Sequence, residues 1–137
     1  MTRALPTGFE LDDDPARIDV DAVHDFLSNH AYWATGRARE TVEWLVREAD
    51  RVVGVYRGDR QVGFARAVTD GVAFAYLADV YVLPDFRGHG LGIELVREMI
   101  EHGPYAGVKW LLHTTDAHDL YRRFGFAAPS EKVLERV

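Results

Sequence analysis

A glycine-rich turn lies between two apolar segments and could bind an anion. Gly88, Gly90 and Gly92 alternate with other residues just before a segment with helical spacing. A helix start leaves backbone N–H groups unpaired and carries a partial positive charge. Glycines have no Cβ and accept positive φ, so several N–H groups can converge on one phosphate. The turn therefore predicts a phosphate site or a plain helix cap, and the glycines alone leave both open.

Two well-known phosphate-binding motifs do not match this turn. A Walker-type loop requires Gly-Lys-Ser/Thr, whereas this chain has His89-Gly90-Leu91. A dinucleotide-binding fold requires the spacing G-x-G-x-x-G after an early strand, and the three glycines here alternate instead. The sequence therefore does not indicate a nucleoside triphosphate or a dinucleotide.

Strand and helix patterns on either side would hold the turn in place. Val72–Val82 is long, apolar and aromatic, which is typical of a buried strand, and Pro84 ends it. From Leu91 to Ile100 apolar residues recur every three or four positions, which predicts a helix. His102-Gly103-Pro104 is a stop signal for that helix.

The rest of the chain predicts more strands and helices around these two. In chain order they are an extended segment at Gly8–Leu11, amphipathic helices near Val20–Leu27 and Arg39–Ala49, a hairpin of Arg51–Tyr56 and Gln61–Thr69, a strand at Lys109–Thr114, a helix carrying Ala117 to Phe124 and a final strand near Lys132–Arg136. We expect an α/β fold, with one mixed sheet and helices on both faces, in which residues 1–137 form a single domain.

Composition limits the classes of partner. A net charge of −6 argues against a general nucleic-acid binder, and no stretch approaches the length of about 20 apolar residues that spans a membrane. The chain has no cysteine, and its six histidines lack metal-ligand spacing, so we expect no metal. We expect a cytoplasmic protein, as a monomer or a homodimer.

Two motifs together carry a family resemblance. Arg87-Gly88-His89-Gly90-Leu91-Gly92 fits the pattern Arg/Gln-x-x-Gly-x-Gly/Ala after a strand that ends in "DVYVLP", and "DAHDLYRRFGF" follows at Asp116–Phe126. The chain resembles the GNAT superfamily of acetyl-CoA-dependent N-acetyltransferases, well over Gln61–Phe126 and loosely in the amino-terminal helices. The resemblance implies a central, mostly antiparallel mixed sheet and acetyl-CoA as cosubstrate.

The resemblance also implies the contacts with the cofactor. The backbone of Arg87, Gly88, His89, Gly90, Leu91 and Gly92 would hold the pyrophosphate of coenzyme A. The backbone of Tyr81 and Val82 would contact the pantetheine arm, which enters where this strand splays from the next one. Thr114 stands where many family members have Asn, and its hydroxyl could contact the cofactor.

Tyr121 matches the tyrosine of the family motif "LYxxxGF", which in many members protonates the departing thiolate. A phenol with a pKa of about 10 can donate to a thiolate whose thiol titrates at about 8.5. Because Tyr121 shares an apolar row with Ala117, Leu120 and Phe124, packing in the core is the alternative.

Asp79 interrupts an otherwise apolar strand beside the expected pantetheine site. An attacking amine must lose a proton, so a carboxylate or an ordered water is needed nearby. Asp79 is the candidate base, and the alternative is that it faces a wet cleft or accepts local hydrogen bonds.

In this family the amino-terminal helices and their loop largely set acceptor specificity, so Tyr32 and Trp33 are candidates to line the acceptor side. The leading hypothesis is an N-acetyltransferase that acts on a primary amine of a small molecule. The alternatives are a non-catalytic CoA-binding sensor or interaction module, and acetyl transfer to an amino group of a protein or peptide.

Overall fold

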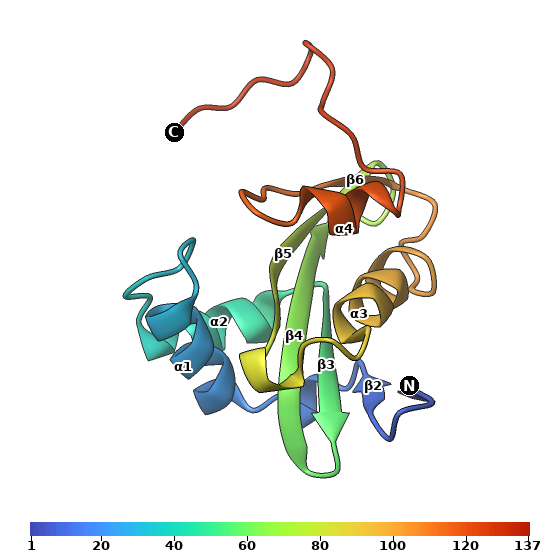
Figure 1. The fold of residues 1–137 in the computed structure, drawn as a ribbon. Helices are drawn as coiled ribbons and strands as arrows, with labels where there is room; N and C mark the ends of the chain where they lie inside the picture. Colours follow the sequence, from blue (N-terminus) through green and yellow to red (C-terminus); the bar gives the residue numbers. More distant parts are fainter.

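The computed structural model describes residues 1–137 and contains a six-stranded sheet between two layers of helices (Figure 1). The strands lie side by side in chain order as β1 (Thr2–Ala4), β2 (Glu10–Asp12), β3 (Arg51–Arg57), β4 (Arg60–Thr69), β5 (Phe74–Val82) and β6 (Lys109–Leu111). Neighbours are antiparallel except β5 and β6, which are parallel. The predicted mixed, mostly antiparallel sheet is confirmed.

Helices cover both faces of the sheet, as predicted. α1 (Val20–His30) and α2 (Arg39–Glu48) lie on one side, and α3 (Leu91–Ile100) lies on the other (Figure 1). The short α4 (His118–Arg122) follows β6, and 3-10 turns occupy Pro15–Arg17 and Pro84–Phe86. None of these helices has both the length and the apolar character that a membrane crossing requires.

Each face of the sheet has its own apolar cluster. The cluster under α1 and α2 includes Val23 and Leu27 of α1 and Phe64 and Tyr81 of the sheet. The cluster under α3 is formed by the following buried residues: Phe9, Leu11, Val53, Val55, Val62, Ala65, Ala67, Leu77, Val82, Leu91, Leu95, Val96, Met99, Ile100 and Tyr121. Alternation of side chains along the strands sends neighbouring residues to opposite clusters.

A buried charge network fixes α3, which carries the glycine turn. The Glu98 carboxylate is only 2% exposed and accepts hydrogen bonds from Arg3 Nε and from Arg51 Nη2, each at 2.7 Å. Arg51 Nη1 also donates to the Glu98 carbonyl at 3.0 Å. Because a buried carboxylate must be paired, these bonds set the position of α3 against β1 and β3.

The edge of β5 that faces β6 is open over most of its length. Only Phe74–Tyr76 pair with β6, at Lys109–Leu111, so the half of β5 that ends at Val82 has no neighbour on this side. Toward β4 the register shifts between Phe64 and Arg66. Asp79 lies opposite this shift and has φ +55°, the only positive φ outside glycine, so β5 contains a β-bulge there.

The final strand predicted near Lys132–Arg136 is wrong. These residues form no strand, and the chain after Phe126 runs away from the sheet (Figure 1). Val133 and Leu134 are adjacent rather than alternating, and Leu134 is 93% exposed, so this segment has no apolar face to bury against the sheet.

Two other predicted strands are shorter than expected. β5 begins at Phe74 rather than Val72, because the Asp70 carboxylate accepts hydrogen bonds from the N–H groups of Val72 and Ala73 and holds a turn. β6 ends at Leu111 rather than Thr114.

Candidate active site

The glycine turn presents a row of unpaired backbone donors. Gly88 has φ +88° and Gly90, directly before α3, has φ +72°. None of the N–H groups from Gly88 to Ile93 donates a hydrogen bond within the protein. Arg87 to Gly90 are exposed, so these donors at the positive end of α3 can be reached by an anion.

Side chains around the turn fasten it to the sheet. Arg87 Nε donates to the Val82 carbonyl at 3.0 Å, which ties the turn to the end of β5. The His89 ring lies against Phe9, with ring centroids 5.6 Å apart.

The side chain of Tyr81 packs in the core. It stacks on Phe26 on the α1 side, with ring centroids 4.1 Å apart, and burial raises the pKa of its phenol. The Tyr81 side chain is therefore a core residue, and only its backbone could contact a cofactor at the open edge.

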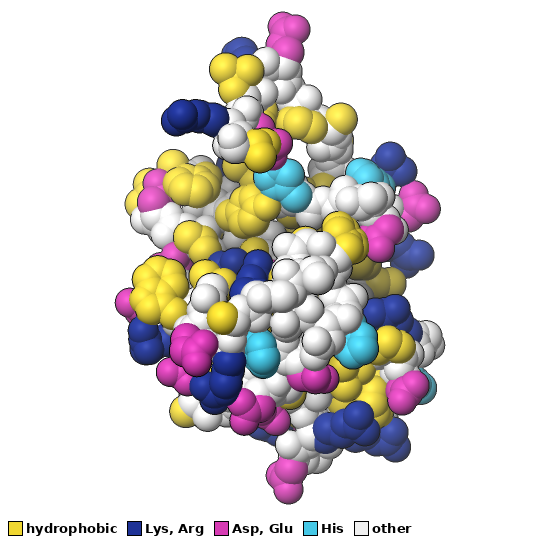
Figure 2. All heavy atoms as spheres, turned by 90° about the vertical axis from the view of Figure 1, so that its left-hand side faces the viewer, with side chains coloured by type: hydrophobic (Ala, Val, Ile, Leu, Met, Phe, Trp, Pro, Cys, Tyr) yellow, Lys and Arg dark blue, Asp and Glu magenta, His cyan; other side chains and the backbone are white.

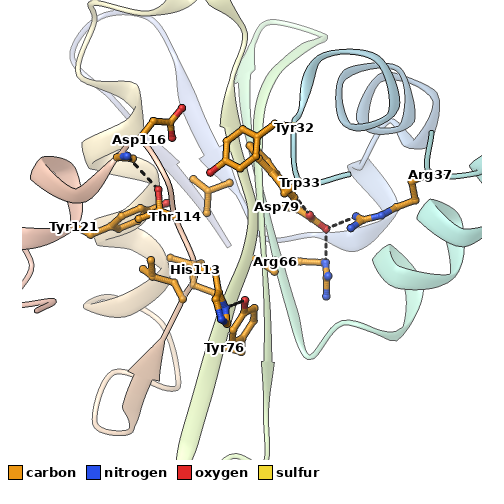
Figure 3. Close-up of a pocket in the computed structure, with 15 residues that line it drawn as sticks. Tyr32, Trp33, Arg37, Arg66, Tyr76, Asp79, His113, Thr114, Asp116 and Tyr121 are labelled. Carbon is orange, nitrogen blue, oxygen red and sulfur yellow. Dashed lines mark hydrogen bonds and ion pairs between the residues drawn. The ribbon is translucent and has the colours of Figure 1, made fainter. Parts of the chain in front are cut away.

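A pocket of about 280 Å³ lies where β5 leaves β6 (Figure 3). Its walls come from β5, from the loop between β6 and α4, from α4, and from the loop between α1 and α2, with Arg66 of β4 at one side. The pocket contains five of the predicted site residues: Tyr32, Trp33, Asp79, Thr114 and Tyr121. The other predicted residues, at Tyr81, Val82 and Arg87–Gly92, lie outside it.

Asp79 is the most heavily bonded side chain in this pocket. Its Oδ1 accepts from Trp33 Nε1 at 2.8 Å, and its Oδ2 accepts from Arg37 Nη1 at 2.9 Å and from Arg66 Nε at 2.7 Å (Figure 3). Burial raises the pKa of Asp79, but the charge and hydrogen bond of Arg66, aided by Arg37 and Trp33, outweigh it and hold the pKa below its ordinary value. A carboxylate held in this way is a weak proton acceptor.

Tyr121 lines the pocket from α4 and is 8% exposed. Its ring meets Phe126 edge to face, with centroids 5.8 Å apart. Burial raises the pKa of Tyr121 to about 12, with smaller contributions from Tyr32 and Asp116. The phenol therefore keeps its proton at neutral pH and is present as a hydrogen-bond donor, while the raised pKa makes it a weaker acid than a free tyrosine.

The loop between α1 and α2 connects the two walls of the pocket. Tyr32 and Trp33 meet edge to face at 5.1 Å. The Tyr32 hydroxyl accepts from the Thr115 N–H at 2.9 Å, while Trp33 reaches Asp79 on the opposite side. Thr114 Oγ1 accepts from the Ala117 N–H at 3.1 Å, just before α4.

Several lining residues were not predicted from the sequence, notably Arg37, Arg66, Tyr76 and His113. Arg66 had a sequence signal, because it is a charge within the apolar run of β4.

Figure 2 shows acidic and basic side chains interspersed over the face that carries α1 and α2, with no continuous patch of one sign. The structure contains no group of three or more His, Cys, Asp or Glu that could hold a metal ion.

Comparison with known proteins points to one family. The sequence model of the acetyltransferase (GNAT) family matches residues 18–126, a range that includes the turn and every residue lining the pocket. A Gibberella zeae protein assigned as an acetyltransferase is 30% identical over 133 residues, covering 82% of this chain and 75% of that protein. The peptidyl-lysine N-acetyltransferase YjaB of Salmonella typhimurium is 34% identical over 119 residues, covering 87% of this chain and 77% of that protein.

A solved structure from Xanthomonas campestris, described as belonging to the same family of acetyltransferases, is 33% identical to this chain. The two superpose with a TM-score of 0.89 over 94% of this chain and 92% of the other.

Asp79→Asn tests how strongly the carboxylate supports the fold. Asn also accepts positive φ, so the bulge is kept while Arg37 and Arg66 lose their counter-charge. We expect the free energy of unfolding at pH 7 to fall by about 3 kcal/mol. Because the pKa of Asp79 is lowered by folding, its contribution is present above its ordinary value of 3.8 and is lost as pH falls through the lower folded-state value.

In urea unfolding, the difference between wild type and Asp79→Asn should therefore be constant from about pH 7 to 5 and narrow below about pH 4. The matched control is Asp59→Asn, an exposed residue without a charged partner, which should change stability by less than about 0.5 kcal/mol. A difference that persists unchanged to about pH 3 would contradict the assigned role.

Proposed function

The chain belongs to the acetyltransferase (GNAT) family, and on that basis we propose that it moves an acetyl group from acetyl-CoA to a primary amine of a small molecule by direct attack. One observation carries the proposal: the unpaired N–H groups of the glycine turn and the pocket with Tyr121 lie along the same open edge of β5. We also propose that residues 1–137 act as one domain, which the continuous sheet from β1 to β6 supports.

In this proposal the turn and the open edge of β5 bind acetyl-CoA. The unpaired N–H groups of Gly88–Gly92 hold the pyrophosphate, which a free helix start favours, whereas the Arg87 N–H is already bonded to the Pro84 carbonyl. The backbone of Tyr81 and Val82 pairs with the amides of pantetheine, and the Thr114 hydroxyl is a further contact at the pocket. The thioester then reaches the pocket, where the acceptor amine enters past Tyr32 and Trp33.

Catalysis would depend on positioning and on charge stabilisation rather than on a covalent enzyme intermediate. The amine attacks the acetyl carbon, a backbone N–H stabilises the oxyanion, and Tyr121 protonates the thiolate of coenzyme A. Asp79, bonded to three donors, is better suited to hold Trp33, Arg37 and Arg66 in place than to accept a proton. We therefore propose that Asp79 positions these side chains, and that another group takes the proton of the amine.

A lysine side chain of a protein or peptide is the second candidate acceptor. The Salmonella typhimurium relative is named as a peptidyl-lysine N-acetyltransferase, and a lysine ε-amine is itself a primary alkylamine. Both candidates need the same turn and the same Tyr121, so they differ only in what fills the acceptor side.

The proposal is tested by incubating the protein with acetyl-CoA and a panel of primary amines and lysine peptides, with release of the CoA thiol as the signal. We expect release that depends on the amine and is fastest with a small molecule. Release of the thiol with the lysine peptides alone would show that the acceptor is a peptide rather than a small molecule. Binding of coenzyme A without release for any amine would contradict acetyl transfer.

Two glycines of the turn should respond differently to alanine. At Gly90 the positive φ disfavours any side chain, so Gly90→Ala should cost the bound turn about 1–2 kcal/mol and weaken coenzyme A binding about tenfold. Gly92 has no positive φ, and a Cβ there would come no closer than 4.0 Å to Leu120. Gly92→Ala should therefore keep its affinity, as measured by calorimetric titration; unchanged affinity in Gly90→Ala as well would argue against binding at this turn.

Tyr121→Phe separates the hydroxyl from the packing of the ring. Because the ring still fills the same space, we expect stability within about 1 kcal/mol of wild type and kcat lowered about 100-fold, with little change in KM for acetyl-CoA. Tyr105→Phe, outside the pocket, is the matched control. Full turnover in Tyr121→Phe with the best acceptor would remove Tyr121 as the acid.

A further inference from the structure

Three side chains from separate segments form a hydrogen-bonded series at the wall of the pocket. The Tyr76 hydroxyl of β5 is bonded to Nδ1 of His113, in the loop after β6 (Figure 3). Nε2 of the same ring is bonded to Oε2 of Glu135, in the carboxyl-terminal segment, residues 127–137. Tyr76 and His113 both line the pocket.

The chemistry of these groups sets the direction of the hydrogen bonds. A carboxylate only accepts, so His113 Nε2 carries a proton and donates it to Glu135. The other nitrogen of a neutral imidazole then accepts, so the Tyr76 hydroxyl donates to His113 Nδ1. The Tyr76 oxygen keeps lone pairs free, and its own proton has a path to an imidazole that a carboxylate holds in place.

The carboxyl-terminal segment supplies little to the fold besides this contact. Leu134 and Val137 are almost fully exposed, and the segment has no helix or strand. The bond from Glu135 to His113 is the only hydrogen bond or ion pair that links residues 127–137 to the rest of the protein. A segment without apolar anchors thus places one carboxylate beside the pocket.

We propose that Tyr76, His113 and Glu135 form the relay that takes the proton of the acceptor amine, an inference that rests on the acetyl transfer proposed above. The amine nitrogen bonds to the acetyl carbon, and its proton passes to the Tyr76 oxygen while the Tyr76 proton passes to His113 Nδ1. The C–S bond breaks, and the thiolate takes the proton of Tyr121. Tyr76 is the catalytic residue of this step, and His113 and Glu135 act through it.

The surroundings of the relay fit this direction of transfer. Arg66 and Asp79 face Tyr76 from β4 and β5, but they are bonded to each other at 2.7 Å, so their charges largely offset. Glu135 is bonded to the ring nitrogen of His113 opposite the one that faces Tyr76, so its carboxylate lies next to the ring that would receive the proton. The His113 side chain is 68% exposed, so the proton can leave to water after each turnover. The remaining ionisable groups at the pocket are Tyr32, Arg37, Asp116 and Tyr121.

The test uses two acceptors of the same shape and different basicity, 2-phenylethylamine and its β,β-difluoro analogue, on the full chain. The fluorinated amine holds its proton less tightly and needs less help to lose it. We expect Tyr76→Phe to lower kcat about 100-fold and Glu135→Gln about tenfold with 2-phenylethylamine, and each less than about threefold with the analogue. KM for acetyl-CoA should not change.

Glu131→Gln is the matched control, because Glu131 lies in the same exposed segment and has no hydrogen-bond or ion-pair partner. Equal losses with both amines, or none, would overturn the relay, since a purely structural role cannot distinguish the acceptors. No turnover by wild type with any amine would overturn acetyl transfer and the relay with it. Glu135→Gln changes an exposed side chain, so it decides the matter even if Tyr76→Phe fails to fold.

Discussion

The site depends on one backbone distortion, the β-bulge at Asp79. A left-handed conformation costs a residue with a side chain about 1–2 kcal/mol, so it persists only where its surroundings hold it. Here Arg66 of β4 and the loop that carries Trp33 and Arg37 all bind the Asp79 carboxylate. The bulge turns that carboxylate toward its partners, and the partners hold the bulge. β5 and the loop between α1 and α2 are thereby fixed by a single charged group.

The surroundings of Asp79 and Tyr121 hold these two groups in different protonation states. Asp79 is held as a carboxylate by its cationic partners, and Tyr121 is held as a phenol by burial. Neither Asp79 nor Tyr121 changes charge near neutral pH, so these two contributions to the electrostatics of the pocket are constant there.

Local patterns in the sequence were enough for much of the fold and for part of the site. Helical spacing identified α3, and the glycines before it identified the turn, because both depend on residues close in the chain. Asp79 stood out as a charge in an apolar strand, but its partners lie 13 to 46 residues away, so its bonding could not be deduced. The contact of Glu135 with His113 depends on the path of the final segment, which has neither periodicity nor a buried face.

The two apolar clusters divide the site between two layers of the molecule. The loop with Tyr32 and Trp33 follows α1 and belongs to one layer, whereas the glycine turn precedes α3 and belongs to the other. Substitutions in α1 and α2 therefore change packing on one face and leave the packing under α3 intact. Under the proposed function the acceptor side belongs to the first layer and the cofactor turn to the second, so acceptor preference could drift during evolution, or be redesigned in the laboratory, while the second layer stays constant.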